Sequence, residues 1–265
     1  MQFYGACPGA VPPACVSKQT SVTNPVSVSP TIFAGTKFYV GTTVRVAQTA
    51  LDGTGNFVAA SRFPATDAGP FTGVVYDGTK FYAAFGAATS SAYAFTSALG
   101  TPSWKTDFAS ATILGIPVVD PAISNGLLIN TNEPKLYGLA PTTGAATSLM
   151  TPASSSSTPL LGDDTRIYLG LNAGAIVAVN DSGGRLVSWS YPLSKPVNAA
   201  LTMSCDGTLY AAAGDTVYAL VTDAGGLRNS SLWPKYQRDT RNSGNADVAT
   251  IWGVRTVPGA AGCTP

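Results

Sequence analysis

Three short runs of alternating apolar and polar residues, joined by tight turns, recur along the whole chain. The clearest copy spans residues 166–189 and reads R-I-Y-L-G-L-N-A-G-A-I-V-A-V-N-D-S-G-G-R-L-V-S-W. Its first run contains Tyr168, its second ends at Val179, and its third closes on Trp189. Alternation with a period of two between Gly, Asn and Asp turns is typical of antiparallel strands. Each copy therefore predicts a three-stranded meander.

Two independent markers give the same repeat length. The residues equivalent to Tyr168 are spaced by 43, 47, 39 and 42 residues, and they are Tyr39, Tyr82, Ile129, Tyr168 and Tyr210. The residues equivalent to Val179 are spaced by 44, 44, 40 and 41, and they are Leu51, Phe95, Leu139, Val179 and Leu220. A glycine follows each of the second set, at Gly55, Gly100, Gly144, Gly183 and Gly225. Strand-rich repeats of about 40–45 residues are typical of β-propeller blades.

Tryptophan marks the third run of three copies, at Trp104, Trp189 and Trp233, which follow the second marker by 9, 10 and 13 residues. We expect these side chains on the outer strands as ordinary packing residues rather than as a ligand platform. The tyrosines at the first marker, Tyr39, Tyr82, Tyr168 and Tyr210, are expected to be structural repeat positions as well.

One meander exposes two apolar faces and becomes stable only when stacked on its neighbours. We therefore predict an all-β fold in which residues 1–265 form a single β-propeller of five or six blades. Residues 28–242 would supply five repeats. Residues 1–27 and 243–265 would be closing segments, because a ring must pair its ends to remove its open edges. The chain length holds about six periods, which favours six blades.

The charge of the chain argues against a nucleic-acid partner, and its hydropathy argues against insertion into a membrane. Charged residues make up 11% of the chain and its formal net charge is +1. The segment from Lys235 to Arg255 carries a small basic excess, too small for nucleic-acid binding by counterion release, and we expect it to be solvated surface with Arg–Asp pairing. No run of 18 apolar residues occurs, which argues against membrane insertion.

Catalytic chemistry is poorly represented. The chain has no histidine and a single glutamate, Glu133. Most aspartates stand in turns, where the carboxylate bonds the backbone two residues on, and no motif pairs the remaining ones, which are Asp107, Asp120, Asp163, Asp164 and Asp215. General acid–base catalysis and glycoside hydrolysis need His or facing carboxylates. We therefore assign no catalytic, cofactor-binding or metal-binding residue, with Ca²⁺ at Asp163 and Asp164 or near Asp52 as the lesser alternative.

The four cysteines are Cys7, Cys15, Cys205 and Cys263. An even number in such a chain points to disulfides and an oxidising compartment, and four cysteines allow three connectivities. We expect Cys7 to pair with Cys15 and Cys205 with Cys263. The start M-Q-F-Y-G-A-C lacks the basic and apolar regions of a secretory signal, so we expect either that a signal was removed or that the chain is a piece of a longer surface protein.

The units V-A-V-N-D-S-G-G-R-L-V-S-W and V-Y-A-L-V-T-D-A-G-G-L-R-N-S-S-L-W resemble the repeats of the PQQ-like propeller superfamily. The stretch W-P-K-Y-Q-R-D-T-R-N-S-G also resembles a segment that extracellular bacterial members carry beside their repeats. The resemblance implies a propeller and a bacterial location at the cell surface, in the periplasm or outside the cell. Quinoprotein dehydrogenases of this superfamily bind pyrroloquinoline quinone with Ca²⁺, but this chain lacks their adjacent cysteine pair. The resemblance therefore favours a non-enzymatic member.

The sequence leads to three hypotheses about function. The first is a non-catalytic binding or scaffold propeller that recognises a protein or a glycan through loops on one face, with the turns within residues 85–93 and 130–135 as the most divergent candidates. The second is a multivalent lectin, which would repeat the same polar and aromatic residues in every copy. The third, a quinoprotein or a hydrolase, is disfavoured by the missing residues.

Overall fold

A computed structural model describes residues 2–3, 18–19, 32–34, 37–41, 45–50, 61–63, 69–86, 89–96, 99–181, 187–240, 242, 244 and 246. Within these residues all regular structure is β-strand, and four four-stranded sheets and one three-stranded sheet follow one another along the chain. Neighbouring strands in each sheet are consecutive in sequence and antiparallel. The predicted all-β class with antiparallel meander blades is confirmed.

The five sheets are called blades one to five. Blade one holds β3 (Ile32–Ala34), β4 (Lys37–Gly41), β5 (Val46–Ala50) and β6 (Ser61–Phe63). Blade two holds β7 (Phe71–Tyr76), β8 (Phe81–Phe85), β9 (Ser90–Phe95) and β10 (Trp104–Phe108). Blade three holds β11 (Val118–Val119), β12 (Leu127–Asn130), β13 (Lys135–Leu139) and β14 (Ala146–Met150). Blade four holds β15 (Leu160–Leu161), β16 (Arg166–Leu171), β17 (Ala175–Asn180) and β18 (Val187–Pro192). Blade five holds β19 (Thr202–Met203), β20 (Thr208–Ala213) and β21 (Thr216–Val221).

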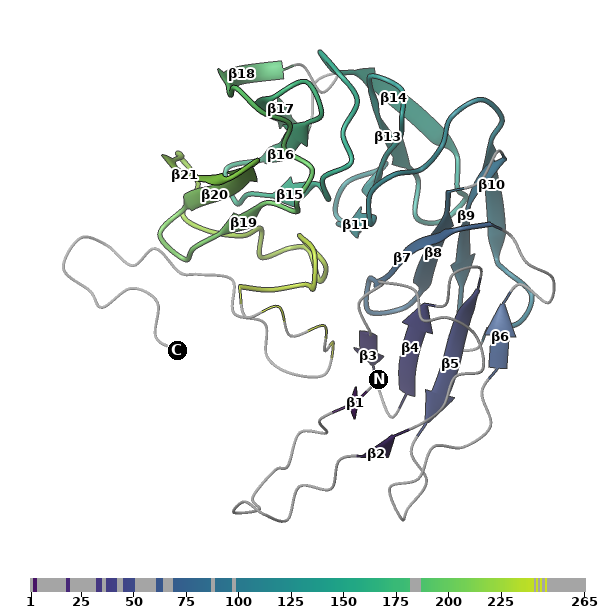
Figure 1. Ribbon diagram of the computed structural model, residues 1–265. Helices are drawn as coiled ribbons and strands as arrows, with labels where there is room; N and C mark the ends of the chain where they lie inside the picture. Colours follow the sequence, from purple (N-terminus) through teal and green to yellow (C-terminus); the bar gives the residue numbers. More distant parts are fainter. Residues whose placement is uncertain are drawn as a thin grey trace, which may run out of the picture.

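The blades spread as a fan, with the first strand of each innermost and the last strand outermost (Figure 1). Two further short strands, β1 (Gln2–Phe3) and β2 (Lys18–Gln19), pair with each other in a separate sheet. Most of residues 1–27 and 243–265 lie outside the described residues. Closure of the fan by the two chain ends, and the choice between five and six blades, therefore stay predictions.

Apolar side chains fill the spaces between neighbouring blades. One buried cluster joins blades one, two and three, a second joins blades three and four, and a third joins blades four and five. The middle strands supply most of these residues; every residue of β8 and β9 is buried, for example. Because both faces of a middle strand meet a neighbouring blade, its residues are apolar throughout rather than alternating. Stacking of this kind makes the fan a rigid support for its turns.

The tyrosine and tryptophan markers meet across the sheet in two blades. In blade two, Ala94 lies between Tyr82 and Trp104 in the strand register, and the two rings lie 5.9 Å apart. Blade four repeats the arrangement with Ala178 between Tyr168 and Trp189, whose ring centroids lie 5.8 Å apart. The small alanine side chain leaves room for the larger rings on either side to approach each other.

The same tyrosines are held by turn carboxylates. Tyr82 donates to Asp77 Oδ2 at 2.6 Å, and Tyr168 donates to Asp164 Oδ2 at 2.6 Å. Burial, followed by the hydrogen bond to the carboxylate, raises the pKa of both phenols. Each turn is thereby tied to the second strand of its own blade.

The structure adds a strand that the three-run repeat does not predict. All five blades begin with an inner strand, which is only two residues long in β11, β15 and β19. Two residues are too few to show a period of two. Tyr39 and Tyr168 are buried in their second strands, whereas Tyr210 of β20 is 37% exposed. The marker residues Leu51, Gly55 and Gly183 lie outside the described residues.

Candidate functional site

The chain leaves blade five after β21 and crosses the centre of the fan. The described residues of the segment 227–246, which are 227–240, 242, 244 and 246, are called the axial segment and run beside the inner strands of three other blades (Figure 1). Leu227 bridges to Gly162 beside β15, and Trp233 bridges to Val119 of β11. Further along, Phe33 of β3 donates to Gly244 O at 2.8 Å. An inner strand has backbone N–H and C=O groups on the side that faces no other strand of its sheet. The axial segment supplies hydrogen-bond partners for some of these groups.

Two expectations about this part of the chain are wrong. Trp233 was expected on the outer strand of blade five, but it lies at the centre against β11 and is 2% exposed. Trp104 and Trp189, by contrast, lie on the fourth strands β10 and β18. The charged stretch after Trp233 was expected to be solvated surface with Arg–Asp pairing. Arg238 and Asp239 do form an ion pair, at 3.9 Å, but Lys235, Arg238 and Asp239 are each 1% exposed, so the stretch is buried. The position of the segment explains both differences, because it lies against the inner strands of blades one, three and four.

Backbone carbonyls replace water around the buried Lys235. Its Nζ donates to the carbonyl oxygens of Tyr236 at 2.7 Å and Asp239 at 3.1 Å, and also to Asn242 Oδ1. Removal from water lowers the pKa of Lys235 to about 8, against a smaller opposing effect of the Asp239 carboxylate. Gln237, Arg238 and Asn242 have positive φ values of 58°, 77° and 54°. This part of the axial segment therefore forms compact turns in which the charged side chains are buried.

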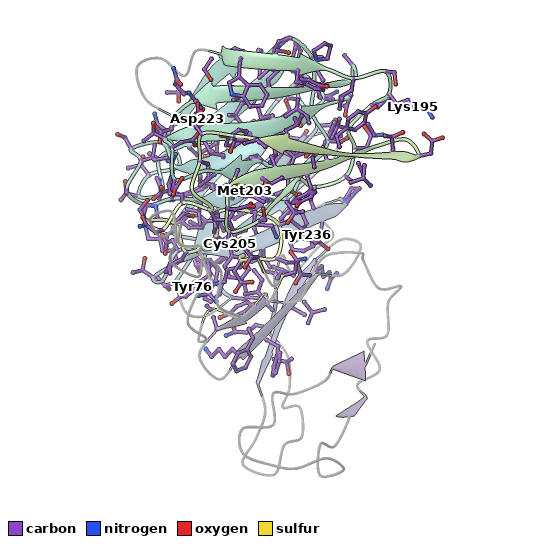
Figure 2. All side chains as sticks on the ribbon, turned by 90° about the vertical axis from the view of Figure 1, so that its left-hand side faces the viewer. Tyr76, Lys195, Met203, Cys205, Asp223 and Tyr236 are labelled. Atoms are coloured by element: carbon purple, nitrogen blue, oxygen red, sulfur yellow. The ribbon has the colours of Figure 1, made fainter. Side chains whose placement is uncertain are left out.

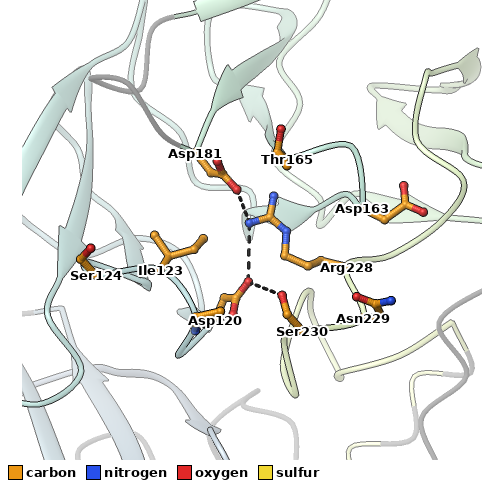
Figure 3. Close-up of a pocket in the computed structure, with 10 residues that line it drawn as sticks. Asp120, Ile123, Ser124, Asp163, Thr165, Asp181, Arg228, Asn229 and Ser230 are labelled. Carbon is orange, nitrogen blue, oxygen red and sulfur yellow. Dashed lines mark hydrogen bonds and ion pairs between the residues drawn. The ribbon is translucent and has the colours of Figure 1, made fainter.

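A pocket of about 550 Å³ lies where the axial segment meets blades three and four (Figure 3). The residues that line it come from the turn after β11, the turn after β15, the end of β17 and the start of the axial segment. They are Asp120, Ala122, Ile123, Ser124, Asp163, Thr165, Asp181, Arg228, Asn229 and Ser230. All ten are polar or small except Ile123, and none is aromatic.

Arg228 forms the floor of this pocket. Its Nη1 contacts Asp181 Oδ2 and lies 3.5 Å from Asp120 Oδ2, while its Nε donates to Gly162 O at 3.0 Å. The side chains of Arg228 and Asp120 are 7% and 1% exposed. Figure 3 shows the guanidinium between the two carboxylates, with Ser230 donating to Asp120 at 2.9 Å. Arg228 Nη2 is buried and has no hydrogen-bond partner.

The rim of the pocket is exposed and held by the backbone. Asp163 Oδ1 accepts a hydrogen bond from Gly225 N at 2.7 Å, and Asp163 N donates to Gly226 O at 3.1 Å. These two bonds connect the turn after β15 to the chain that enters the axial segment. Asn229 and Thr165 are exposed beside it. The rim therefore offers polar groups to solvent on a fixed backbone.

The pocket lies on the face that carries the turns between first and second strands, here called the front face. The turns expected to bind a ligand, within residues 85–93 and 130–135, join second to third strands and lie at the opposite end of the blades, the back face. Figure 2 shows Asp223 and Lys195 at these two ends. On the back face Glu133 accepts bonds from Tyr137 at 2.7 Å and Lys135 at 3.0 Å.

Sequence reasoning singled out two pocket residues without recognising the site. Asp120 and Asp163 were among the aspartates outside regular turns, and the structure brings both to the pocket. Asp107, Asp164 and Asp215 instead form ion pairs elsewhere, with Lys105, Arg166 and Lys195. Arg228 and Asp181 were missed. The only signal for Arg228 was its place in a stretch where the repeat spacing lengthens, before Trp233.

The described residues contain no group of three or more His, Cys, Asp or Glu side chains arranged to hold a metal ion. Cys205 lies in the turn after β19 and is disulfide-bonded. Cys7, Cys15 and Cys263 lie outside the described residues, so the expected pairing stays a prediction. In the part of the chain that the structure describes, no helix has the length and hydropathy required to cross a membrane.

A comparison of this structure with solved structures finds similar β-propeller proteins. The crystal structure of BamB from Moraxella catarrhalis has a TM-score of 0.58 and 15% identity, and the match covers 76% of this chain and 64% of that chain. Sqt1 from Saccharomyces cerevisiae has a TM-score of 0.59 and 16% identity, with coverage of 74% and 58%. The chain thus spans about three fifths of the length of these proteins. At such low identity the likeness shows the fold alone.

Comparison with curated protein sequences finds no match. Residues 41–219, which extend from the end of β4 into β21, match the family described as "Outer membrane protein assembly factor BamB". The match covers more than half of the chain and includes all the strands of blades two to four. On the evidence of this match and of the antiparallel blades, the chain belongs to the PQQ-like β-propeller family of the outer membrane protein assembly factor BamB.

Proposed function

We propose that the protein is a non-catalytic binding propeller of the bacterial envelope or exterior, and that it holds a protein partner at its front face. The observation that carries the proposal is the pocket on that face, in which two blades and the axial segment fix polar groups around a hollow of about 550 Å³. This volume is within the range of about 300–1,000 Å³ that ligand pockets occupy. A rigid support with a polar rim suits recognition.

The chemistry of the pocket supports binding over catalysis. The guanidinium of Arg228 has N–H donors and no acceptor atom, so it cannot serve as a general base. The carboxylates of Asp120 and Asp181 are engaged by that guanidinium. Proton transfer needs a group that is poised to change its protonation state within reach of the reacting atom. Arg228, Asp120 and Asp181 are instead held to one another by ion pairs, as groups are that fix a shape.

A protein partner fits the pocket better than a glycan. The lining contains no aromatic ring on which the apolar face of a sugar could pack. Matched residues of this kind are not repeated from blade to blade either, as a multivalent lectin would require. The description of the matching family names an assembly factor for outer membrane proteins. By analogy, contact with protein at the envelope is the simplest role for this chain.

Two observations support a location outside the cytoplasm. The family description names a factor that assembles outer membrane proteins, and such a factor would work in the bacterial envelope. The disulfide at Cys205 is of the kind that persists in oxidising compartments such as the periplasm and the cell surface.

Photo-crosslinking tests the proposal. A photoreactive phenylalanine analogue at exposed Asn229 on the pocket rim is compared with the same analogue at exposed Asp215 on the back face. After incubation with envelope and secreted fractions of the source organism, we expect a discrete protein adduct from position 229 only. Excess wild-type chain should suppress this adduct, whereas the Asp163→Lys chain should not. Equal adducts at both positions, or binding on a glycan array without any protein adduct, would show the proposal to be wrong.

A further inference from the structure

The pocket contains a hydrogen-bond donor that the protein does not use. Arg228 is 5% exposed, and its Nη2 has no acceptor although the other two guanidinium nitrogens are bonded. A buried N–H without a partner is costly and is usually satisfied by a bound group or a water molecule. An acceptor such as a carbonyl oxygen is therefore expected at this point of the pocket.

The pocket also contains acceptors that the protein does not use. Asp163 Oδ1 receives Gly225 N–H and Asp181 Oδ2 receives Arg228. Within the described residues the second oxygen of each carboxylate has no partner. An ionised carboxylate has capacity for about four hydrogen bonds and only accepts. These oxygens call for a donor, most favourably a charged one.

The net charge of the pocket indicates whether the ligand group that donates these hydrogen bonds is cationic or anionic. Three carboxylates line the pocket and one guanidinium opposes them, which leaves an excess of two negative charges. The guanidinium is already shared between Asp120 and Asp181, so one excess charge stays on that buried cluster and the other is carried by Asp163 on the exposed rim. A cation is attracted to this site, and an anion is repelled.

We infer that the pocket takes a basic side chain of an extended segment of the protein partner. The ammonium or guanidinium group donates to Asp163 on the rim, and a main-chain carbonyl of the same segment accepts from Arg228 Nη2. This inference rests on the proposed function and specifies the partner. The pocket volume of about 550 Å³ holds one long side chain together with its flanking backbone.

The residues that line the pocket favour an unmodified basic side chain over a methylated one. Quaternary ammonium groups are recognised by the faces of aromatic rings, and none of the ten lining residues is aromatic. Carboxylates require N–H donors, which a trimethylated lysine lacks. The pocket is therefore expected to prefer unmodified lysine or arginine.

The test uses the full chain and capped pentapeptides of sequence Gly-Ser-X-Ser-Gly, in which X is lysine, arginine, norleucine or trimethyl-lysine. Affinity is measured by isothermal titration and ligand-observed NMR at low salt. The Asp163→Asn chain keeps the oxygen that receives Gly225 N–H and loses the charge. Asp215→Asn makes the same change on the back face, where Asp215 pairs with Lys195, and is the matched control.

We expect the lysine and arginine peptides to bind the wild-type and Asp215→Asn chains alike, and to bind Asp163→Asn about tenfold more weakly, the loss of one charge-assisted bond. Norleucine and trimethyl-lysine peptides should bind at least about tenfold more weakly than lysine. Binding should weaken as salt is added. Equal binding of norleucine, no effect of Asp163→Asn, or no binding of any basic peptide would overturn the inference. If the crosslink at position 229 nevertheless forms, the proposed function survives and only the ligand class is wrong.

Discussion

Arg228 should stabilise the front face through its ion pairs with Asp120 and Asp181. The substitution Arg228→Met measures how much free energy of unfolding these pairs contribute. The substitution keeps most of the side-chain volume but removes the guanidinium that lies between Asp120 and Asp181. Asp120 is 1% exposed and would be left with hydrogen bonds from Ser230 and from Ala122 N, but without a positive charge. Breaking a buried ion pair on one side costs about 3–5 kcal/mol. We expect the Arg228→Met chain to lose free energy of unfolding in this range.

A second variant separates the buried charge from the loss of packing. In Arg228→Met with Asp120→Asn, the asparagine is neutral, and its side-chain oxygen still accepts from Ala122 N. Replacing a buried pair by neutral groups is often close to neutral in stability, so most of the loss should be recovered. Asp181 is 12% exposed and remains partly solvated. Recovery would show that the unpaired Asp120 carboxylate, and not the missing arginine stem, causes the loss.

Urea denaturation at pH 7, followed by circular dichroism and tryptophan fluorescence, gives both free energies of unfolding. The matched control is Lys195→Met, which breaks an exposed ion pair with Asp215 on the back face and should cost no more than about 1 kcal/mol. A cost below about 1 kcal/mol for Arg228→Met, or a double variant no more stable than the single one, would refute the picture of a buried cluster held together by ion pairs.

Three further substitutions test the packing and the charges. Gly144→Ala should lower the free energy of unfolding by about 1–3 kcal/mol in urea, because Gly144 has a φ of 75° and an added Cβ would lie 2.6 Å from the Trp104 ring. Tyr168→Phe should cost about 1–2 kcal/mol in the same assay by removing the donor to Asp164. The pKa of Lys235 is about 8 when folded and 10.5 in the unfolded chain, so between these values the unfolded chain binds more protons and stability rises with pH. Thermal unfolding should show wild type gaining about 2–3 kcal/mol over Lys235→Met from pH 8 to pH 10, and a constant difference would contradict a buried ammonium.

The sequence predicts the parts of this fold that carry long, repeated patterns. The second and third strands of the blades contain the recurring markers, and Tyr82, Phe95, Tyr168 and Val179 all lie on them. These strands are five or six residues long in blades two and four. A stretch of that length can show alternation or a run of apolar residues, and the repeat confirms it several times over.

The inner strands and the axial segment could not be predicted in the same way. β11 and β15 have two residues each, and their partners come from residues 227–246, far along the chain. Trp233 followed its marker by 13 residues instead of the 9 and 10 of the other two copies. That longer spacing was the visible sign that the fifth copy departs from the repeat. It could not show where the chain goes instead, because that depends on which strands have backbone groups to satisfy.

The candidate site arises at the point where the repeat is broken. Asp120, Asp163 and Asp181 each belong to a blade, and the contacts that connect them to the chain after blade five come from Arg228 and Gly225. A sheet repeated around an axis leaves its inner edges open, and only a segment outside the repeat can satisfy several of them at once. Because that segment meets turns from two blades, it also collects their side chains into one hollow. The position of the pocket is therefore a consequence of how the fan satisfies its inner strands, and a variant that detaches the axial segment should lose the pocket before it loses the blades.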